Sequence, residues 1–100
     1  MTSRIDKSKV FEISQVDLSG SQLKVSGRAY NTIKVGDVLL ACDPDGNTDD
    51  CVSFRVTGIT MYGREIEEME AVFTAWLILE GDNRNILEKS SYLFSEYVLS

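Results

Sequence analysis

The sequence contains no histidine, only one proline and only two cysteines among its 100 residues. Histidine titrates near neutral pH and is the base in Ser-His and Cys-His nucleophilic pairs. Its absence removes the commonest forms of acid-base and nucleophilic catalysis. The paired carboxylates that remain fall in stretches typical of exposed turns rather than in a cleft. We therefore predict that the protein is not an enzyme.

Cysteine is also too scarce for a metal centre of the usual kind. Tetrahedral zinc takes four ligands, usually Cys and His, and this chain offers only Cys42 and Cys51. No metal and no cofactor is expected. Without a secretion signal, the two cysteines are interpreted most simply as reduced thiols. Eight residues separate them, so a bridge across a hairpin is also conceivable.

Long hydrophobic runs are absent as well. No stretch approaches the roughly 18 apolar residues of a membrane-spanning helix, and no apolar segment follows the charges at the N-terminus. We predict a flexible N-terminus at residues 1–8, a single domain at residues 9–100, a cytoplasmic location and no membrane association. The phosphate loop GxxxxGK[ST] is missing too, so no nucleotide is expected to bind.

Negative charge is in excess and is unevenly distributed along the chain. The net charge is -6; residues 1–40 carry six basic and four acidic side chains, and residues 41–100 carry four basic and twelve acidic ones. An acidic surface repels phosphate backbones, so nucleic acid is at most a secondary partner. The imbalance favours a basic protein partner or simply confers solubility.

The hydrophobic pattern predicts strands far more than helices. Apolar and polar residues alternate over residues 9–18, 23–30 and 52–57, and residues 38–42 form a short apolar run. A last strand is predicted over residues 92–99. The phase slips near Ser14, as a β-bulge would cause. Residues 71–80 are apolar on both faces, with Phe73 in phase with Leu77, which predicts a central strand. Residues 64–71 are interpreted as a solvated turn, and 86–89 as one helical turn.

These elements predict an all-β fold, a small antiparallel closed barrel of six or seven strands. A closed ring leaves no exposed sheet edges for aggregation. Residues 43–50 form a polar excursion at the tip of the second hairpin, an acidic loop that contains Asp43, Asp45, Asp49 and Asp50. A calcium-binding loop of the EF-hand type would need glycine at its sixth position, whereas Gly46 comes fourth. A turn is the preferred interpretation.

An ordered set of short motifs extends the pattern: Gly27-Arg28, the Thr32 to Asp37 segment, the Val56 to Ile59 segment and the Leu77 to Gly81 segment. Together they resemble the second domain of translational GTPases such as elongation factor Tu, over about seventy percent of the chain. The resemblance implies a translation-protein-like barrel. It departs from the family where acidic side chains that approach transfer RNA are replaced by Tyr30 and Thr60, and where a glycine is replaced by Ser90.

The resemblance also implies one candidate binding face. It combines aromatic, sulfur and guanidinium groups of the kind enriched in protein interfaces. Its residues are Arg28, Tyr30, Thr60, Met61, Tyr62 and Arg64. The alternative is that Tyr30, Met61 and Tyr62 cap the barrel end or fill its core.

Two functions remain open at this point. In the first, a stand-alone, non-enzymatic barrel binds a protein partner, with a possible link to translation. In the second, a small acidic immunity protein or antitoxin masks the basic surface of a toxin. The fold resemblance favours the first and the charge favours the second.

Overall fold

The structure is a computed structural model that describes residues 4–42, 51–82 and 85–99, with side chains for residues 9–42, 51–82 and 85–95. Strands dominate it, with a single short helix among the described residues. The elements are β1 (Arg4–Asp17), β2 (Leu23–Ala29), β3 (Ile33–Lys34), β4 (Val38–Cys42), β5 (Cys51–Met61), β6 (Arg64–Ile66), β7 (Glu68–Met69), β8 (Thr74–Glu80), α1 (Asn85–Lys89) and β9 (Tyr92–Leu99).

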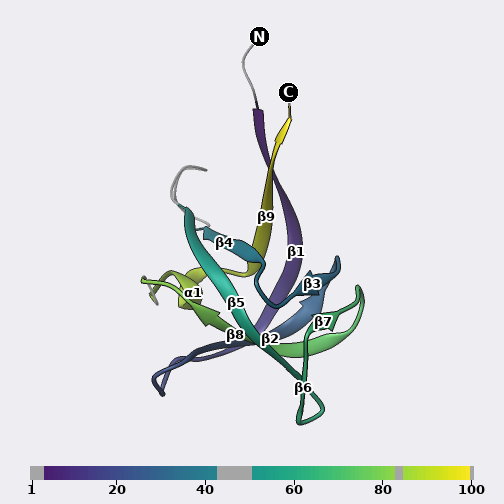
Figure 1. Ribbon diagram of the computed structural model, residues 1–100. Coiled ribbons are helices and arrows are strands. Elements are labelled where there is room, and N and C mark those ends of the chain that lie inside the picture. The colour runs from purple at the N-terminus through teal and green to yellow at the C-terminus, as the bar shows by residue number, and fades with distance from the viewer. Residues whose placement is uncertain (1–3, 43–50, 83–84, 100) are drawn as a thin grey trace.

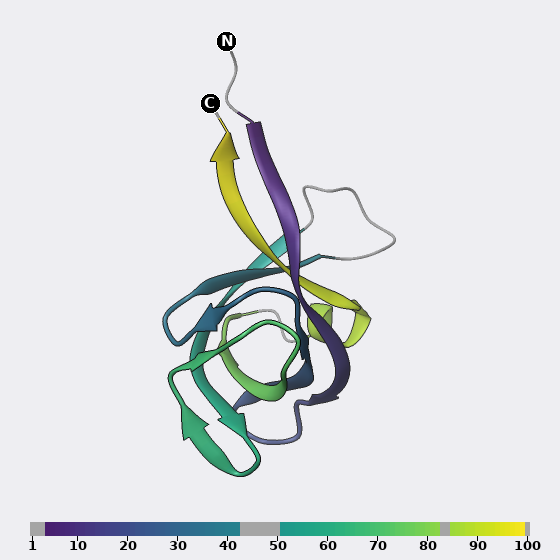
Figure 2. The ribbon, with the colours of Figure 1, turned by 90° about the vertical axis from the view of Figure 1, so that its right-hand side faces the viewer.

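The strands close into a ring. Their order is β4-β9-β1-β2-β8-β5, and β5 pairs with β4 again, which makes a six-stranded antiparallel barrel. Strand β6 is an extra strand on β5, and β3 pairs with β7 in a separate small sheet. Figures 1 and 2 show the ring from two sides. The predicted all-β closed barrel is confirmed.

The first hairpin follows the sequence pattern closely. Strands β1 and β2 are antiparallel neighbours, and their register shifts between Ile13 and Gln15. This shift confirms the bulge that the phase slip near Ser14 predicted. In β2, buried and more accessible residues alternate, with Val25 and Ala29 completely buried. One face of the hairpin therefore packs into the barrel and the other remains accessible.

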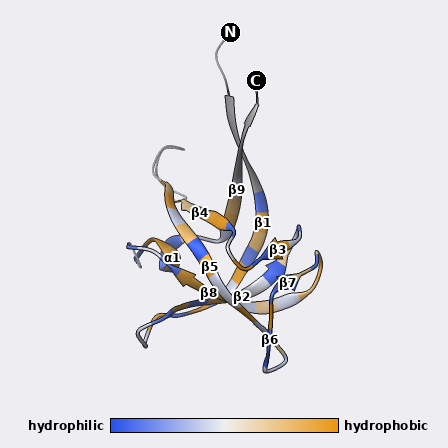
Figure 3. Cartoon of the chain, in the orientation of Figure 1, coloured by the Kyte–Doolittle hydropathy of each residue, from blue (hydrophilic) through white to orange (hydrophobic). Residues whose placement is uncertain are grey.

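The interior of the ring is filled by apolar side chains from nearly every strand. Figure 3 shows the apolar residues along the barrel strands and the helix. The largest of the fully buried side chains are Phe11, Phe54, Ile33, Ile59, Met69, Leu77, Leu87, Leu93, Val25 and Val56. Helix α1 covers one side of this core with Ile86 and Leu87. A barrel with this number of strands is narrow enough for its own side chains to fill the interior.

Strand β8 is central, as predicted, but it is shorter than the pattern indicated. It lies between β2 and β5 and begins at Thr74, not at residue 71. Val72 adopts a positive φ of 69°, so the chain turns there and cannot yet be extended. The alternation placed Phe73 on the same side of the strand as Leu77, but Phe73 is 46% exposed while Leu77 is buried.

The interpretation of residues 64–71 as a turn also needs correction. The segment contains the two short strands β6 and β7, which pair with β5 and β3. Periodicity could not find them, because strands of two or three residues are too short to show an alternation. The four glutamates of the segment are all exposed, as a solvated segment requires.

Strands β1 and β9 continue beyond the ring as a two-stranded ribbon (Figures 1 and 2). Arg4 is the register partner of Leu99, and the pairing continues from there to Glu12 and Tyr92. Strand β1 therefore begins inside the segment 1–8 that we expected to be flexible. It pairs there with β9, a long-range contact that local sequence does not reveal.

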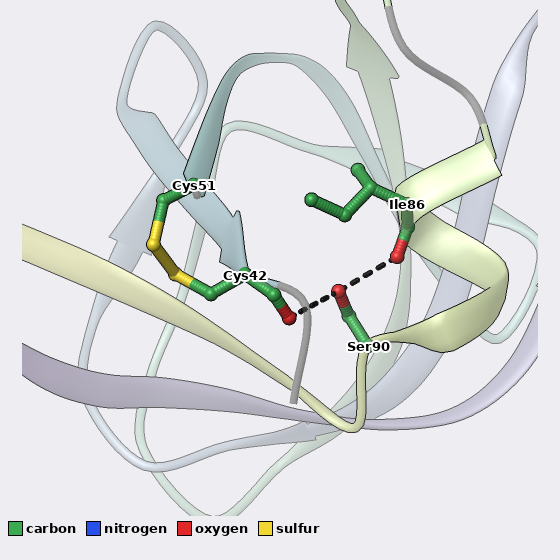
Figure 4. Close-up of a disulfide and its surroundings, with 4 residues drawn as sticks. All are labelled: Cys42, Cys51, Ile86 and Ser90. Atoms are coloured by element: carbon green, nitrogen blue, oxygen red, sulfur yellow. Dashed lines mark hydrogen bonds between the residues drawn. A yellow bond between two sulfur atoms is a disulfide. The ribbon is translucent and has the colours of Figure 1, made fainter. Parts of the chain in front are cut away.

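The two cysteines form a disulfide, which corrects their interpretation as reduced thiols. Cys42 and Cys51 are direct register partners at the end of the β4-β5 hairpin, and their sulfur atoms are bonded. The Ser90 hydroxyl lies 3.1 Å from the carbonyl oxygen of Cys42 and 2.7 Å from that of Ile86 (Figure 4). Ser90 is buried, so its hydroxyl links the end of α1 to the disulfide-bearing strand.

Reduction of this disulfide should destabilise the barrel without abolishing it. The bridge closes a loop with a sequence separation of 9. In the chain-entropy treatment, a loop of that length contributes about 2.5 kcal/mol. We expect urea unfolding with a reductant to show a loss of about that size. A variant with both cysteines changed to serine should show the same loss and no response to the reductant.

A thiol assay on the native protein can contradict the same prediction. Two titratable thiols in the native protein, together with unchanged stability on reduction, would contradict the bridge. Since disulfides persist mainly in oxidising compartments, the assay also bears on the predicted cytoplasmic location.

Candidate functional site

The side chains that point outward from three neighbouring strands form one continuous surface, here called the outer face. Its centre is β8, whose Ala75, Leu77 and Leu79 point into the core. The intervening residues of β8 and their register neighbours on β2 and β5 therefore point outward. The outer face consists of Lys24, Ser26, Arg28, Gly58, Thr60, Thr74, Trp76 and Ile78.

The register places two of the predicted site residues on this face. Arg28 is the cross-strand partner of Thr74, and Thr60 is the partner of Trp76. Since Thr74 and Trp76 are next-but-one neighbours on β8, Arg28 and Thr60 lie on opposite sides of the same strand. The sequence prediction therefore brought together residues that share a surface.

Trp76 lies in a hollow that the sequence analysis did not single out. A depression of about 210 Å³ is lined by Asp17, Lys24, Thr60, Trp76 and Ile78. Trp76 is only half-buried there, although indole is the largest apolar side chain available. The signal was the apolar outer side of residues 71–80, which we interpreted as a sign of a central strand. It also marks an accessible apolar surface.

Asp17, which lines this hollow, accepts two hydrogen bonds from Ser19. Its Oδ1 accepts hydrogen bonds from the Ser19 hydroxyl at 2.7 Å and from the Ser19 backbone N–H at 3.1 Å. These bonds hold the pKa of Asp17 below its usual value, with a smaller contribution from the charge of Lys24. The hollow therefore has one acidic and one basic side chain beside an aromatic ring.

The tip of the β5-β6 hairpin presents the most exposed aromatic residue of the predicted site. Met61 and Arg64 are register partners, so Tyr62 and Gly63 form a two-residue turn. Both have positive φ, 52° and 79°, which a type I′ turn requires. Tyr62 is 89% exposed and Arg64 is exposed. Met61 instead packs partly against the core, as the alternative interpretation proposed.

Tyr30 lies just after the last residue of β2, which follows the outer-face residue Arg28. Its ring centroid is 6.4 Å from that of Tyr92, and the Lys9 ammonium lies 4.2 Å above the Tyr92 ring. Tyr30 is 42% exposed. Its partial burial, together with the charge of Glu12, raises the pKa of Tyr30 above its usual value. The phenol is therefore a neutral hydrogen-bonding group under ordinary conditions.

Exposed apolar residues that sequence analysis missed lie next to Tyr30. The Val72 N–H donates to the carbonyl of Ala29, and the Ala29 N–H donates to the carbonyl of Phe73. Val72 is 64% exposed and Phe73 is 46% exposed. A β-branched residue at positive φ is a conformational outlier, and no sequence pattern predicts such a residue.

The six predicted site residues thus fall into three places. Arg28 and Thr60 lie on the outer face, Tyr62 and Arg64 at the hairpin tip beside it, and Tyr30 just after the end of β2. Met61 is shared with the core. The acidic loop residues Asp43, Asp45, Asp49 and Asp50 lie outside the described residues.

Chemical groups for metal binding do not gather anywhere in the described ranges. Within residues 4–42, 51–82 and 85–99, no group of three or more acidic or cysteine side chains could hold a metal ion. The same part of the chain has no helix that is long and apolar enough to cross a membrane.

Comparisons with known proteins give no family assignment. No model of a known protein family matches this chain, and no curated protein matches its sequence.

Proposed function

We propose that this barrel is a non-enzymatic module that binds a protein partner through the outer face and the adjoining β5-β6 hairpin tip. The observation that carries the proposal is Tyr62. It is a large aromatic residue, 89% exposed, at a turn position whose positive φ is unfavourable for it. Asn, Asp or Gly would suit a type I′ turn better. Tyr62 has an unfavourable backbone conformation and gains no stability from burial, so a contact outside the chain is the best explanation for this side chain.

The surroundings of Tyr62 support the same function. Tyr, Trp and Arg dominate the binding energy of most protein interfaces. Arg64 is exposed beside Tyr62, and Trp76 lies across from Thr60 in an open hollow. The resemblance to the second domain of translational GTPases supports a link to translation as part of this proposal.

Substitution at the hairpin tip should separate binding from stability. We expect Tyr62→Asn to raise the free energy of unfolding by about 0.5 kcal/mol, because Asn tolerates positive φ. The same variant should bind the partner about tenfold more weakly or worse, since an interface aromatic typically contributes 2 kcal/mol or more. Tyr62→Ala and Arg64→Ala should also weaken binding while the melting temperature stays near that of the wild type.

The measurement begins with affinity capture from a native lysate and identification of the captured protein by mass spectrometry. Binding of that purified partner to each variant is then measured by calorimetry, and stability by thermal unfolding. Full binding by Tyr62→Asn and Arg64→Ala would refute the proposed interface. Joint loss of binding and stability would favour a structural role for the tip.

A second candidate function is neutralisation of a basic toxin by an acidic immunity protein or antitoxin. The observation that favours it is a run of exposed carboxylates, namely Glu65, Glu67, Glu68 and Glu70. Glu68 forms an ion pair with Lys34, with 3.5 Å between Nζ and Oε1, and both side chains are largely exposed. Such pairs associate by electrostatic steering. A steep fall of the association rate with added salt, and a toxin as the captured partner, would favour neutralisation.

A further inference from the structure

Two more hollows lie on the outer side of the barrel and run into each other. One has a volume of about 410 Å³ and the other about 390 Å³. Both are lined by Gln22, Thr57 and Ile78, so together they form one trough, here called the Ile78 trough. Ile78 also lines the hollow of Trp76. This side chain is therefore the point where three depressions meet.

The trough exists because strand β5 is irregular at its centre. The register between β5 and β8 shifts between Val56 and Gly58, as in a β-bulge. A Cβ atom on Gly58 would lie only 3.1 Å from Cδ1 of Ile78. The missing side chain at Gly58 leaves the space beside Ile78 open. Bulges of this kind are common next to binding sites, where they change the direction of side chains.

The floor of the trough is apolar and partly accessible. Ile78 and Ile66 are half-buried, and Val35 is 41% exposed. Thr57 adds no free donor, because its hydroxyl donates to the carbonyl of Ile78 at 3.2 Å. A partner group that lies here can bury the accessible apolar surface of these side chains.

The rim of the trough is acidic at both ends. Glu65 and Glu67 line the larger hollow, and Glu80 and Asp82 line the smaller one. All four are exposed. Among the described residues that line either hollow, none is basic. Arg55 is the register partner of Glu80 but does not line the hollow. An apolar floor between two pairs of carboxylates fits a ligand that is apolar in the middle and cationic toward both ends.

We propose that the Ile78 trough binds an extended segment of the protein partner in which lysine or arginine alternates with apolar residues. The inference rests on the proposed function and specifies the chemistry of the partner. Lysine and arginine can lay their aliphatic stems on Ile78 and Ile66 while their charged ends reach the carboxylates. In an extended chain, side chains that point the same way are about 7 Å apart, so basic residues at alternate positions recur along one face of the segment.

A peptide titration tests the site without knowledge of the partner. The probe is a short peptide of alternating lysine and valine, and its control carries glutamate in place of lysine. Amide shifts of the isotopically labelled protein should change at Thr57, Gly58 and Ile78 and over residues 65–67. The glutamate peptide should cause no such changes.

Two double variants with equal charge separate a local site from general attraction. Glu65→Gln with Glu67→Gln removes two carboxylates from the rim. Glu70→Gln with Glu88→Gln removes two exposed carboxylates that do not line the trough. We expect the first to weaken binding of the lysine peptide about fivefold, because two exposed charge pairs of modest strength are lost. The second should change the affinity by less than about twofold.

Equal losses in the two double variants would overturn the proposal, because attraction by net charge would then be sufficient. Shifts centred away from Ile78 would overturn it as well. Failure of the trough can be told apart from failure of the proposed function. A captured partner whose binding depends on Tyr62 and Arg64, but not on Glu65 and Glu67, would leave the function in place and remove the trough from it.

Discussion

Gly27→Ala is expected to prevent the barrel from folding. Gly27 lies in β2 opposite Ile13 on one side and Ala75 on the other. A Cβ atom at this position would overlap the backbone carbonyl of Glu12 and would come within 2.9 Å of Cε2 of Phe11. Backbone cannot move away as a flexible side chain can, so the clash must separate β1 from β2. We expect a loss of at least about 3 kcal/mol in the free energy of unfolding.

Gly20→Ala is the matched control for this substitution. Gly20 lies in the turn between the same two strands, where the nearest heavy atom to an added Cβ is 4.0 Å away. Its φ is not in the left-handed range. The change in stability should stay within about 0.5 kcal/mol. Urea unfolding followed by circular dichroism measures both variants. Near-wild-type stability of Gly27→Ala would contradict the close approach of β1 and β2.

Two adjacent residues of β8 should show opposite effects on stability and binding. Leu77 is completely buried, and truncation to alanine should cost about 3 kcal/mol, through lost apolar burial and the cavity left behind. Ile78 points outward and is half-buried, so Ile78→Ala should cost about 1 kcal/mol. Thermal or urea unfolding of the purified variants measures both values.

Binding of the lysine–valine peptide should follow the reverse order. Ile78→Ala removes the side chain at which the hollows meet, so it should lower the affinity for the peptide severalfold. Leu77→Ala should bind the peptide as the wild type does, at a temperature where it remains folded. The measurement is calorimetry on both variants. If Leu77→Ala lowered the affinity for the peptide more than Ile78→Ala, the conclusion that Leu77 points inward and Ile78 outward would be wrong.

Much of the barrel could be predicted from the sequence, because its strands have one buried face and one solvent-accessible face. Alternation over residues 9–18 and 23–30 predicted the first hairpin, and a phase slip near Ser14 located its bulge. The short helical turn and the last strand were also predicted, and α1 and β9 occupy those positions. Period-two patterns are reliable wherever a strand is long enough to repeat them.

The candidate site could be predicted from the sequence only in part. The motifs singled out Arg28, Thr60, Tyr62 and Arg64, and these residues do lie on or beside one surface. Trp76 was counted as evidence for a buried strand. Residue type cannot tell an apolar side chain under a neighbouring layer from one left open to solvent. That distinction depends on whether another element covers it.

The sequence by itself determined that this chain forms strands, in what order along the chain, and which face of most strands is apolar. Local periodicity contains that information. Only the tertiary structure decided that β4 meets both β5 and β9, that Cys42 pairs with Cys51, and that Ile78 is the meeting point of three hollows. Each of these depends on the register between segments distant in sequence. Register is set by how the whole ring closes, which no local pattern specifies.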